Sequence, residues 1–367
     1  MNSTHDIKVL HVFNDPKFSK PLIEFLVQND ISLKGHMVFH YRWDDSHQMP
    51  HPIALYGTNS FVSPIATLAL LRYLRRAENI FIHGLASPGL LLWISQFKAL
   101  GKRSCWFIWG KDLYFFRMLK KVGIHHRFYE YFRRKAIGNI HRVVTFNTGD
   151  YELLQQWYGY QGGNTQCFSY PSNLYKPMRF AANETDTVNI LVGNSADPSN
   201  NYAQAFKLLA PTANTDQQAP GKIDFRVFSF LSYGDPDYAR EVLALGTSCF
   251  GSRFQAYTEL LSLEEYEKLM AQIDIGVFAH ERQQAFGAIV TLLGHGKKIH
   301  ISRHITTWTL LKDLGFVVYD LESIPYQKIE TQVAEQNIAR AKEVFSSQRL
   351  ARDWTTLLSG DTNETTS

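Results

Sequence analysis

The sequence has few cysteines, and their spacing excludes a disulfide framework or a zinc site of the usual kind. Its 367 residues include three cysteines, Cys105, Cys167 and Cys249, which lie far apart and form no CxxC pair. Disulfide frameworks and zinc sites need several cysteines at characteristic spacings. We therefore expect free thiols and a reducing cytosol, where disulfides rarely persist.

Long hydrophobic runs are also missing. A membrane-spanning helix needs roughly 18 or more apolar residues in a row, whereas the richest segments, SPIATLALL and GLLLWI, are interrupted or shorter. The first residues, MNSTHDIKVLHVF, contain no basic segment followed by an apolar core and a cleavage site, so we expect no export signal. Contact with a membrane is therefore expected to be peripheral.

The sequence has little excess charge of either sign. Its 38 Lys and Arg residues and 34 Asp and Glu residues give a net charge of +4, which does not require nucleic acid as a partner. A content of 45% hydrophobic and 14% aromatic residues is typical of a folded globular protein. A chain of this length is expected to form two domains, each with its own core.

Two series of short β-like runs alternate with helical patterns. The first series lies at 8–13, 36–40, 79–83, 104–109, 141–146 and 166–170, and the second at 189–193, 223–230, 254–259, 273–279, 297–302 and 316–320. Strands that alternate with helices form parallel sheets with helices on both faces. The predicted fold class is α/β, with two Rossmann-like domains facing a central cleft at the carboxyl ends of their strands.

A polar segment with two prolines, PSNLYKPMRFAANETDTVN, separates the two series and is typical of an interdomain linker. We therefore predict an N-terminal domain over residues 1–180 and a C-terminal domain over 181–331. A helical segment is predicted at 332–358. The polar residues 359–367 are expected to form a disordered tail.

The segment NILVGNSADPSN, at 189–200, predicts a strand, a glycine-centred turn and the start of a helix. Gly193 permits a positive φ and a close backbone approach, and Ser195, Asp197, Ser199 and Asn200 can cap the free N–H groups of the helix. Such a turn can bind a phosphate. The alternative is a turn that only changes the direction of the chain.

A second candidate anion site follows the predicted strand at 273–279. Arg282 can hold a diphosphate through two parallel hydrogen bonds, and Gly287 lies at the start of a helix, where it permits close backbone approach. The two turns together predict a diphosphate site made of Gly193, Asn194, Ser195, Arg282, Gln283, Gln284 and Gly287. The alternative is a surface arginine and an ordinary turn glycine.

Tyr233 and Gly234 follow another predicted strand and precede a helix that Asp235 caps and Pro236 begins. Tyr233 is a candidate to stack on a nucleotide base or to donate a hydrogen bond to it. We therefore include Tyr233 and Gly234 in the predicted donor site, with a plain structural cap as the alternative.

Polar and aromatic residues end two strands of the first series. His83 and Gly84 follow one strand, and Trp109, Gly110 and Asp112 follow another. A histidine or an aspartate in such a place can orient an acceptor hydroxyl or act as its general base, so we predict Asp112 and His83 as catalytic residues. The predicted acceptor-binding residues are Gly84, Trp109 and Gly110. As alternatives, Asp112 caps a helix and His83 is structural.

Residues 111–142 interleave basic residues with aromatic and aliphatic ones. The basic residues gather at Lys120, Lys121, Arg127, Arg133, Arg134 and Lys135. This composition favours a helix that lies on an anionic membrane surface. An ordinary amphipathic helix is the alternative. Because no recognition motif is present, we do not expect nucleic acid as a partner.

Four segments carry a resemblance to a known family. FIHG, WFIWGKDLY, ILVGNSADPSN and the RQQ-(x)2-G run at 282–287 resemble, in order and spacing, the 4-acetamido-4,6-dideoxy-D-galactose (Fuc4NAc) transferases of enterobacterial common antigen synthesis. The resemblance implies a GT-B glycosyltransferase, a dTDP-activated sugar donor and a polyprenyl-diphosphate-linked oligosaccharide acceptor. It also implies a peripheral protein at the cytoplasmic face of the inner membrane.

In the mechanism that we predict, the diphosphate site stabilises the negative charge that grows on the leaving nucleotide as the glycosidic bond breaks. We expect neither a metal nor a cofactor, as the resemblance to GT-B enzymes implies. Two other functions remain open. They are a nucleotide-sugar epimerase with the same double-Rossmann shape and a membrane-bound nucleotide-binding protein without transfer activity.

Overall fold

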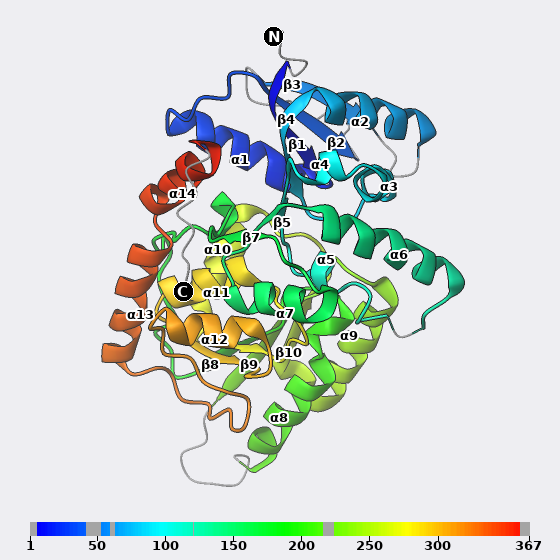
Figure 1. The fold of residues 1–367 in the computed structure, drawn as a ribbon. Helices are drawn as coiled ribbons and strands as arrows, with labels where there is room; N and C mark the ends of the chain where they lie inside the picture. The colour runs from blue at the N-terminus through cyan, green and yellow to red at the C-terminus, as the bar shows by residue number, and fades with distance from the viewer. Residues whose placement is uncertain (1–5, 42–52, 59–62, 120, 216–223, 360–367) are drawn as a thin grey trace. The chain divides into compact units, whose positions relative to one another are not determined.

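The computed structural model describes residues 6–41, 53–58, 63–119, 121–215 and 224–359. The chain forms two compact units (Figure 1). The first unit comprises Met1–Ser172 together with Ser347–Ser367, and the second comprises Asn173–Ser346. Each unit is built around one parallel β-sheet.

The sheet of the first unit has seven strands within the described residues, in the order β3-β2-β1-β4-β5-β6-β7. The strands are β1 (Ile7–Phe13), β2 (His36–Tyr41), β3 (Ala54–Thr58), β4 (Ala77–His83), β5 (Ser104–Phe107), β6 (Arg142–Val144) and β7 (Gly163–Thr165). All neighbouring pairs are parallel. The carboxyl ends of the strands therefore meet at one edge of the sheet.

Helices of the first unit begin where polar side chains cap them. Asp15, Ser63 and Ser87 each accept a hydrogen bond from a backbone N–H of the first turn, and a proline follows each cap. The helices are α1 (Pro16–Gln28), α2 (Pro64–Arg76), α3 (Pro88–Gln96), α4 (Lys98–Gly101), α5 (Lys111–Tyr114), α6 (Ile124–Asn139), α7 (Thr148–Tyr158) and α14 (Ser347–Ser359).

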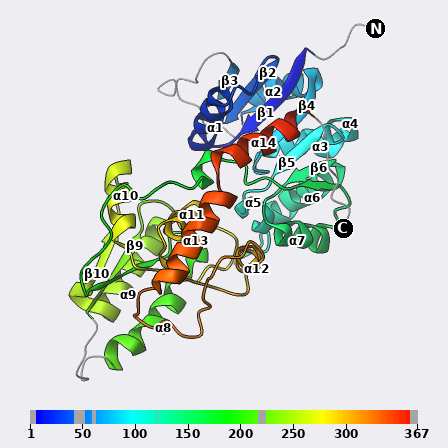
Figure 2. The ribbon, with the colours of Figure 1, turned by 90° about the vertical axis from the view of Figure 1, so that its left-hand side faces the viewer.

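The two faces of this sheet differ in what they bury. Leu10 and Ile80 belong to an apolar core that includes residues of α2 and α3. The next residue along β1, His11, points to the opposite face because side chains alternate along a strand. On that face the indole of Trp354, in α14, stacks on Phe107 with ring centroids 5.3 Å apart. Figures 1 and 2 show α14 beside α1.

The sheet of the second unit has five strands within the described residues, in the order β10-β9-β8-β11-β12. The strands are β8 (Val188–Val192), β9 (Phe225–Phe230), β10 (Phe254–Tyr257), β11 (Ile275–Phe278) and β12 (Lys298–Ile301). The helices are α8 (Tyr202–Thr215), α9 (Pro236–Phe250), α10 (Leu263–Gln272), α11 (Phe286–Gly294), α12 (Thr306–Asp313) and α13 (Thr331–Val344). Its core buries Ile190, Phe206 and Ile275.

Two of the predicted strands are wrong. Residues 166–170 form a loop after β7, because Ser169 adopts a left-handed φ of 64° that ends an extended chain. Residues 316–320 make only an isolated bridge between His300 and Tyr319, and the Val317 amide donates to the side chain of Asn337 instead of to a strand. The prediction also missed β3, which is a half-exposed edge strand.

The predicted domain limits also differ from the structure. The two units divide between residues 172 and 173 rather than near 180. The helical segment predicted at 332–358 is two helices, α13 in the second unit and α14 in the first. From residue 360 on, the predicted tail lies outside the described residues. Among the described residues, no helix is long and apolar enough to cross a membrane.

Candidate functional site

The turn after β8 is shaped by Gly193. Its φ is 64°, and a Cβ atom at this position would lie 2.6 Å from the ring of Tyr202. Any other residue would therefore be strained by both the backbone and the neighbouring ring. Beyond the glycine, the Asn194 backbone N–H donates to Asn200 Oδ1 at 3.0 Å, and Asn194 Nδ2 donates to Tyr233 Oη at 2.9 Å.

Hydrogen bonds below this turn hold it in one shape. Asn200 Nδ2 donates to Ser195 Oγ at 3.1 Å, and His280 Nε2 lies 3.1 Å from Asn200 Oδ1. Because Oδ1 accepts, His280 carries its hydrogen on Nε2. Burial, followed by the nearby positive charge of Arg282, lowers the pKa of His280 to about 3, so this ring is neutral at pH 7.

Arg282 is less available than the sequence suggested. Its Nη2 lies 3.3 Å from Asp197 Oδ2, and its Nη1 donates to the Gln283 carbonyl at 3.0 Å. The arginine is buried. Asp197, which is 85 residues away in the chain, therefore balances part of the charge that was predicted to face a diphosphate.

The start of α11 offers hydrogen-bond donors. Ala285 precedes the helix in a left-handed conformation with φ 58°, and no side chain caps the first turn. The first N–H groups of a helix have no acceptor within the helix, and they carry the positive end of the helix dipole. The side chain of Gln284 is buried, and its Nε2 has no partner among the described residues. Gly287 occupies the second position of α11.

The loops after β8 and β9 are joined to each other. The Ala196 backbone N–H donates to the Tyr233 carbonyl at 2.8 Å, and the Asp235 N–H donates to the Ala196 carbonyl at 3.0 Å. Gly234 has φ 124°, and a Cβ atom there would lie 2.4 Å from the Ala196 carbonyl carbon. The side chain of Tyr233 remains about half exposed, at 51%.

The second unit thus connects most of the predicted donor residues. Hydrogen bonds link the loops that carry Gly193, Asn194, Ser195, Tyr233, Gly234, Arg282, Gln283 and Gln284. Sequence reasoning missed His280, although it follows a strand at the carboxyl edge of the sheet. Asn200, which the sequence indicated only as a helix cap, bonds to Asn194, Ser195 and His280. Asp235 and Asp237 have the spacing of a metal-binding pair, but Asp235 caps α9 and Asp237 pairs with Arg240.

In the first unit, Asp112 braces two loops. Its carboxylate accepts hydrogen bonds from Leu85 N at 2.9 Å, Trp106 Nε1 at 2.7 Å, Trp109 N at 2.9 Å and Leu113 N at 3.1 Å. Burial raises the pKa of Asp112, and the hydrogen bonds oppose this rise. The geometry favours a carboxylate that holds the ends of β4 and β5 in place.

His83 is buried between the rings of Phe13 and Phe107, whose centroids lie 3.8 and 4.5 Å from its own. Its Nε2 lies 3.1 Å from His11 Nδ1, and its Nδ1 lies 2.6 Å from Tyr170 Oη. Burial holds the pKa of His83 well below its ordinary value. Both ring nitrogens already have protein partners, so the geometry favours a residue that orients its neighbours.

The ends of β1, β4 and β5 meet around Trp109. Asn14 Nδ2 donates to the Gly84 carbonyl at 2.8 Å, and a Cβ atom on Gly84 would lie 3.0 Å from the indole of Trp109. Phe18 packs on the same indole, with ring centroids 4.5 Å apart. Gly110 follows with φ 86°. The sequence offered a signal for Asn14, a polar residue directly after a strand, but that signal was overlooked.

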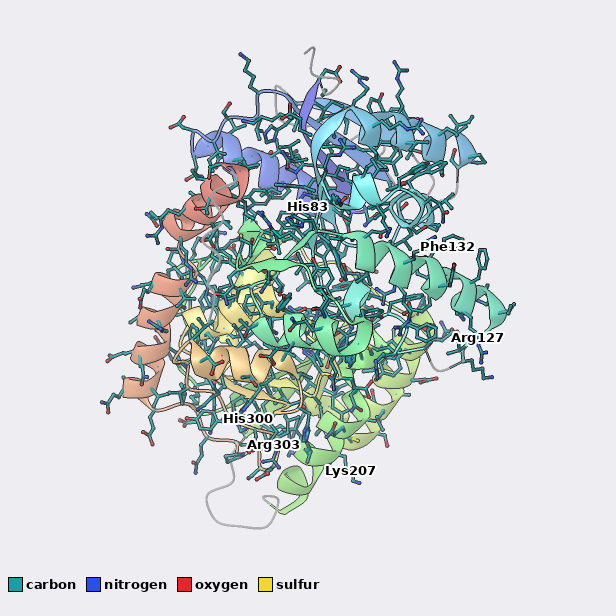
Figure 3. All side chains as sticks on the ribbon, viewed as in Figure 1. His83, Arg127, Phe132, Lys207, His300 and Arg303 are labelled. Carbon is teal, nitrogen blue, oxygen red and sulfur yellow. The ribbon has the colours of Figure 1, made fainter. Side chains whose placement is uncertain are left out.

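The exposed face of α6 is apolar and basic. Ile124, Phe128 and Tyr131 are 83%, 66% and 60% exposed, and Figure 3 shows Arg127 on the same helix. The acidic residue of this helix, Glu130, is buried. It pairs with Arg133 at 2.8 Å and with Arg134 at 3.1 Å.

The structure does not expose all of the basic residues that the sequence predicted for this surface. Arg133 is fully buried and lies inside the unit. Its guanidinium donates a hydrogen bond to the Asp112 carbonyl at 2.7 Å. Lys120 lies outside the described residues. Lys121, Arg127, Arg134 and Lys135 remain exposed. In the described part of the chain, no three His, Cys, Asp or Glu side chains gather as a metal site would require.

Comparisons with known proteins show the family and the fold of this chain. A family model described as 4-alpha-L-fucosyltransferase, glycosyl transferase group 56, matches residues 8–363. The crystal structure of HepE from Anabaena in complex with UDP and glucose is similar, with a TM-score of 0.66, 13% identity, and coverage of 96% of this chain and 100% of that one.

Two further structures have the same fold. A glycosyltransferase from Rickettsia africae has a TM-score of 0.60 at 11% identity and covers 97% of this chain and 98% of its own. A UDP-forming trehalose-phosphate synthase from Burkholderia xenovorans has a TM-score of 0.61 at 11% identity, with coverage of 98% and 100%. These likenesses confirm the predicted α/β fold of two Rossmann-like domains, of the GT-B kind.

Proposed function

Because the chain belongs to the 4-alpha-L-fucosyltransferase family, glycosyl transferase group 56, we propose that it transfers an amino-dideoxy sugar from a dTDP-activated donor to a polyprenyl-diphosphate-linked oligosaccharide. The sugar is Fuc4NAc or a close relative. One observation carries the placement of the donor: α11 begins without a side-chain cap, two residues after the buried Gln284, whose Nε2 lacks a partner among the described residues. HepE, which shares the fold, has been solved with UDP and glucose, and this supports a nucleotide sugar.

In this proposal the donor diphosphate lies at the N-terminus of α11. The N–H groups of the first turn and the positive end of the helix dipole attract the diphosphate, and Gln284 Nε2 supplies a further donor. Negative charge grows on the leaving nucleotide as the glycosidic bond breaks, and fixed donors stabilise it without having to rearrange. We expect α11 to contribute more than Arg282 to binding the diphosphate, because Asp197 Oδ2 lies 3.3 Å from the Arg282 guanidinium and balances part of its charge.

The remaining residues of the proposed sugar-donor site have two roles. Gly193 leaves space for the backbone to approach the ligand, since it has no Cβ and its φ is 64°. Asn194 and Tyr233 are linked by a hydrogen bond of 2.9 Å. The half-exposed ring of Tyr233 is the proposed stacking surface for the thymine base, and Gly234 allows the loop to pass close to Ala196.

The acceptor is proposed to bind the first unit at Gly84, Trp109 and Gly110. Asp112 and His83 orient this site, since their polar atoms bond to the loops and rings around it. Asp112 fixes the backbone of Trp109, and His83 fixes Tyr170. Neither residue removes the proton of the acceptor hydroxyl.

The lipid-linked acceptor suggests a membrane partner, which we propose to be an anionic surface contacted by α6. Ile124, Phe128 and Tyr131 would enter the interface, while Arg127 and Lys135 would meet the lipid headgroups. Glu130 does not oppose this attraction, because it is buried and paired with Arg133. The chain would then work as a peripheral protein at the cytoplasmic face of the inner membrane.

Calorimetric titration with dTDP, UDP and GDP tests the donor. We expect dTDP to bind most tightly, and we expect Gln284→Ala to weaken binding by about tenfold, the loss of roughly one hydrogen bond. Arg303→Ala is the matched control, because Arg303 lies on the surface of the same unit and pairs with Glu322. Tighter binding of UDP or GDP would contradict the dTDP donor.

Transfer itself is tested with a lipid-linked oligosaccharide acceptor and labelled dTDP-sugar. We expect label in the lipid product only when both substrates are present. Isomerisation of the donor in the absence of acceptor would favour the epimerase. Nucleotide binding with no turnover of either kind would favour the binding protein without transfer activity.

A further inference from the structure

Five side chains of the first unit form a continuous hydrogen-bonded chain. His36 Nδ1 lies 3.1 Å from His11 Nε2, and His11 Nδ1 lies 3.1 Å from His83 Nε2. His83 Nδ1 then lies 2.6 Å from Tyr170 Oη, which accepts a hydrogen bond from Trp109 Nε1 at 2.8 Å. The chain runs across β2, β1 and β4 and ends at the loop that follows β5.

The hydrogens of this chain can point in only one direction without leaving a donor unpaired. An indole nitrogen always donates, so Trp109 occupies one acceptor position of Tyr170 Oη. The tyrosine hydrogen is then donated to His83 Nδ1, because Tyr170 has no third hydrogen-bond partner among the described residues. His83 Nε2 donates to His11, and His11 Nε2 donates to His36 Nδ1.

Burial keeps the histidines of the chain neutral. It lowers the pKa of His11 and His83 well below the ordinary value, and it lowers that of His36 to about 4. A neutral imidazole has one donor and one acceptor, which is what each ring in the chain uses. Phe13 and Phe107 stack on His83 at 3.8 and 4.5 Å, so the ring cannot turn over without displacing its neighbours.

The chain ends at an aromatic surface. Trp109 is half-buried. Phe18 and Gly84 cover part of its indole, and the part of the side chain that stays accessible can meet a ligand while Nε1 is held by Tyr170. Gly84 lies against the ring and leaves no room for a side chain. Sugar rings present C–H faces that pack on aromatic side chains, which commonly line ligand sites together with a few fixed polar groups.

We propose that the chain from His36 through His11 and His83 to Tyr170 fixes the Trp109 indole as the stacking surface for an acceptor sugar. Tyr170 is then a positioning residue, because it acts on the acceptor through Trp109. The inference rests on the proposed function, since it takes the first unit as the acceptor side. Beyond that function, it assigns Trp109 as the residue that contacts the sugar, and it assigns Tyr170 and the three histidines as the residues that hold Trp109 in place.

Tyr170→Phe tests the inference, with Tyr160→Phe as the matched control. Tyr170→Phe leaves Trp109 Nε1 and His83 Nδ1 without a partner. Tyr160 is equally buried in the same unit, but its hydroxyl has no hydrogen-bond partner among the described residues, so its loss breaks no bond. In full-length protein labelled with 15N-tryptophan, the indole signal of Trp109 is assigned by its disappearance in Trp109→Phe.

We expect the indole signal to shift or broaden in Tyr170→Phe and to stay in place in Tyr160→Phe. We also expect the KM for the lipid-linked acceptor to rise about tenfold in Tyr170→Phe, with the affinity for dTDP unchanged. An unchanged indole signal in Tyr170→Phe would contradict the hydrogen-bonded chain. A shifted signal with an unchanged acceptor KM would overturn the role in acceptor positioning.

A second pair of variants covers the case in which Tyr170→Phe fails to fold. His36→Gln keeps an oxygen that can accept from His11 Nε2, whereas His36→Leu removes the acceptor. We expect the Trp109 signal to be retained in His36→Gln and altered in His36→Leu, and equal behaviour of the two would overturn the chain. The NMR results do not need turnover, so failure of the proposed function is recognised separately, by absence of transfer in the unmodified protein.

Discussion

The carboxyl ends of the two sheets use their polar groups differently. In the second unit, Asn194 Oδ1, His280 Nδ1 and Gln284 Nε2 are buried without partners among the described residues. In the first unit, Asp112 accepts four hydrogen bonds and His83 uses both ring nitrogens. Unpaired buried groups are costly unless a ligand completes them. The same kind of sheet edge is therefore suited to a polar ligand in one unit and to an aromatic contact in the other.

Asn14 is an exception in the first unit. Its Nδ2 donates to the Gly84 carbonyl, while its Oδ1 is buried without a partner among the described residues. This single acceptor lies beside the loop that supports Trp109. It can accept a hydrogen bond from a sugar hydroxyl, and the aromatic site then has one polar contact that fixes the orientation of the ligand.

The largest effect is expected from Asp112→Ala, which leaves Leu85 N, Trp106 Nε1 and Trp109 N without an acceptor, whereas Leu113 N keeps the Gly110 carbonyl. Since each buried donor left unpaired costs about 1–3 kcal/mol, we expect the free energy of unfolding to fall by about 4 kcal/mol. Denaturation in urea measures this change. Asp237→Ala is the control, because Asp237 is exposed and its carboxylate forms an ion pair with Arg240 on the surface of α9.

If Asp112→Ala and Asp237→Ala destabilise the protein equally, then Asp112 is not the brace that the hydrogen bonds indicate. A selective loss of acceptor binding in Asp112→Asn, with dTDP binding preserved, would sharpen the contrast between the units. The amide keeps one acceptor oxygen and replaces the other by a donor, so we expect a smaller loss of stability than in the alanine variant.

Acid should destabilise the protein through its buried histidines. The pKa of His36, His295 and His300 is lowered to about 4 and that of His280 to about 3, in each case mainly by burial. Between about pH 6.5 and pH 4 the unfolded chain binds more protons than the folded chain, so the free energy of unfolding falls as the pH falls. We expect a loss of about 3 kcal/mol or more.

Urea denaturation at pH 7 and pH 4.5 measures the acid effect. Asp353 opposes it, because burial raises its pKa to about 6 in the folded chain, which favours the folded state as the pH falls. His280→Asn keeps a donor for Asn200 Oδ1 and removes one titrating group, so the loss at pH 4.5 should be smaller in this variant. Equal losses in the variant and the unmodified protein would show that His280 is not held neutral.

The donor turn is tested by Gly193→Ala, with Gly251→Ala as the control. Both glycines have a positive φ, 64° and 57°, but the Cβ atom at 193 meets the Tyr202 ring at 2.6 Å, whereas the one at 251 meets nothing within 4 Å. Both alanine variants therefore strain the backbone, but only the alanine at 193 also collides with a neighbouring side chain. We expect Gly193→Ala to weaken dTDP binding at least tenfold by calorimetry, and Gly251→Ala to leave it unchanged.

The smallest effect of a single substitution is expected on binding to membranes. Arg127→Glu reverses a charge on the exposed face of α6, and each basic residue near an anionic surface contributes about 1 kcal/mol. We expect a fall of about tenfold in binding to vesicles that contain phosphatidylglycerol, measured by sedimentation. Arg303→Glu, in the second unit, is the matched control. Equal losses in the two variants would indicate an effect of net charge and not of α6.

The sequence by itself determined what depends on near neighbours in the chain. The turn at Gly193, the caps at Asp15, Ser63 and Asp235, and most of the strands follow from patterns a few residues long. Such patterns fix the local backbone through sterics and through the capping of free N–H groups. They therefore predicted two Rossmann-like domains and the loops that carry the candidate site.

Only the tertiary structure decided which polar atoms are already paired. Asp197 meets Arg282 across 85 residues, and Tyr170 meets His83 across 87. The order of strands in each sheet sets these meetings, and no short pattern encodes that order. For the same reason the sequence could not show that α14 returns to the first unit, where Trp354 packs against Phe107.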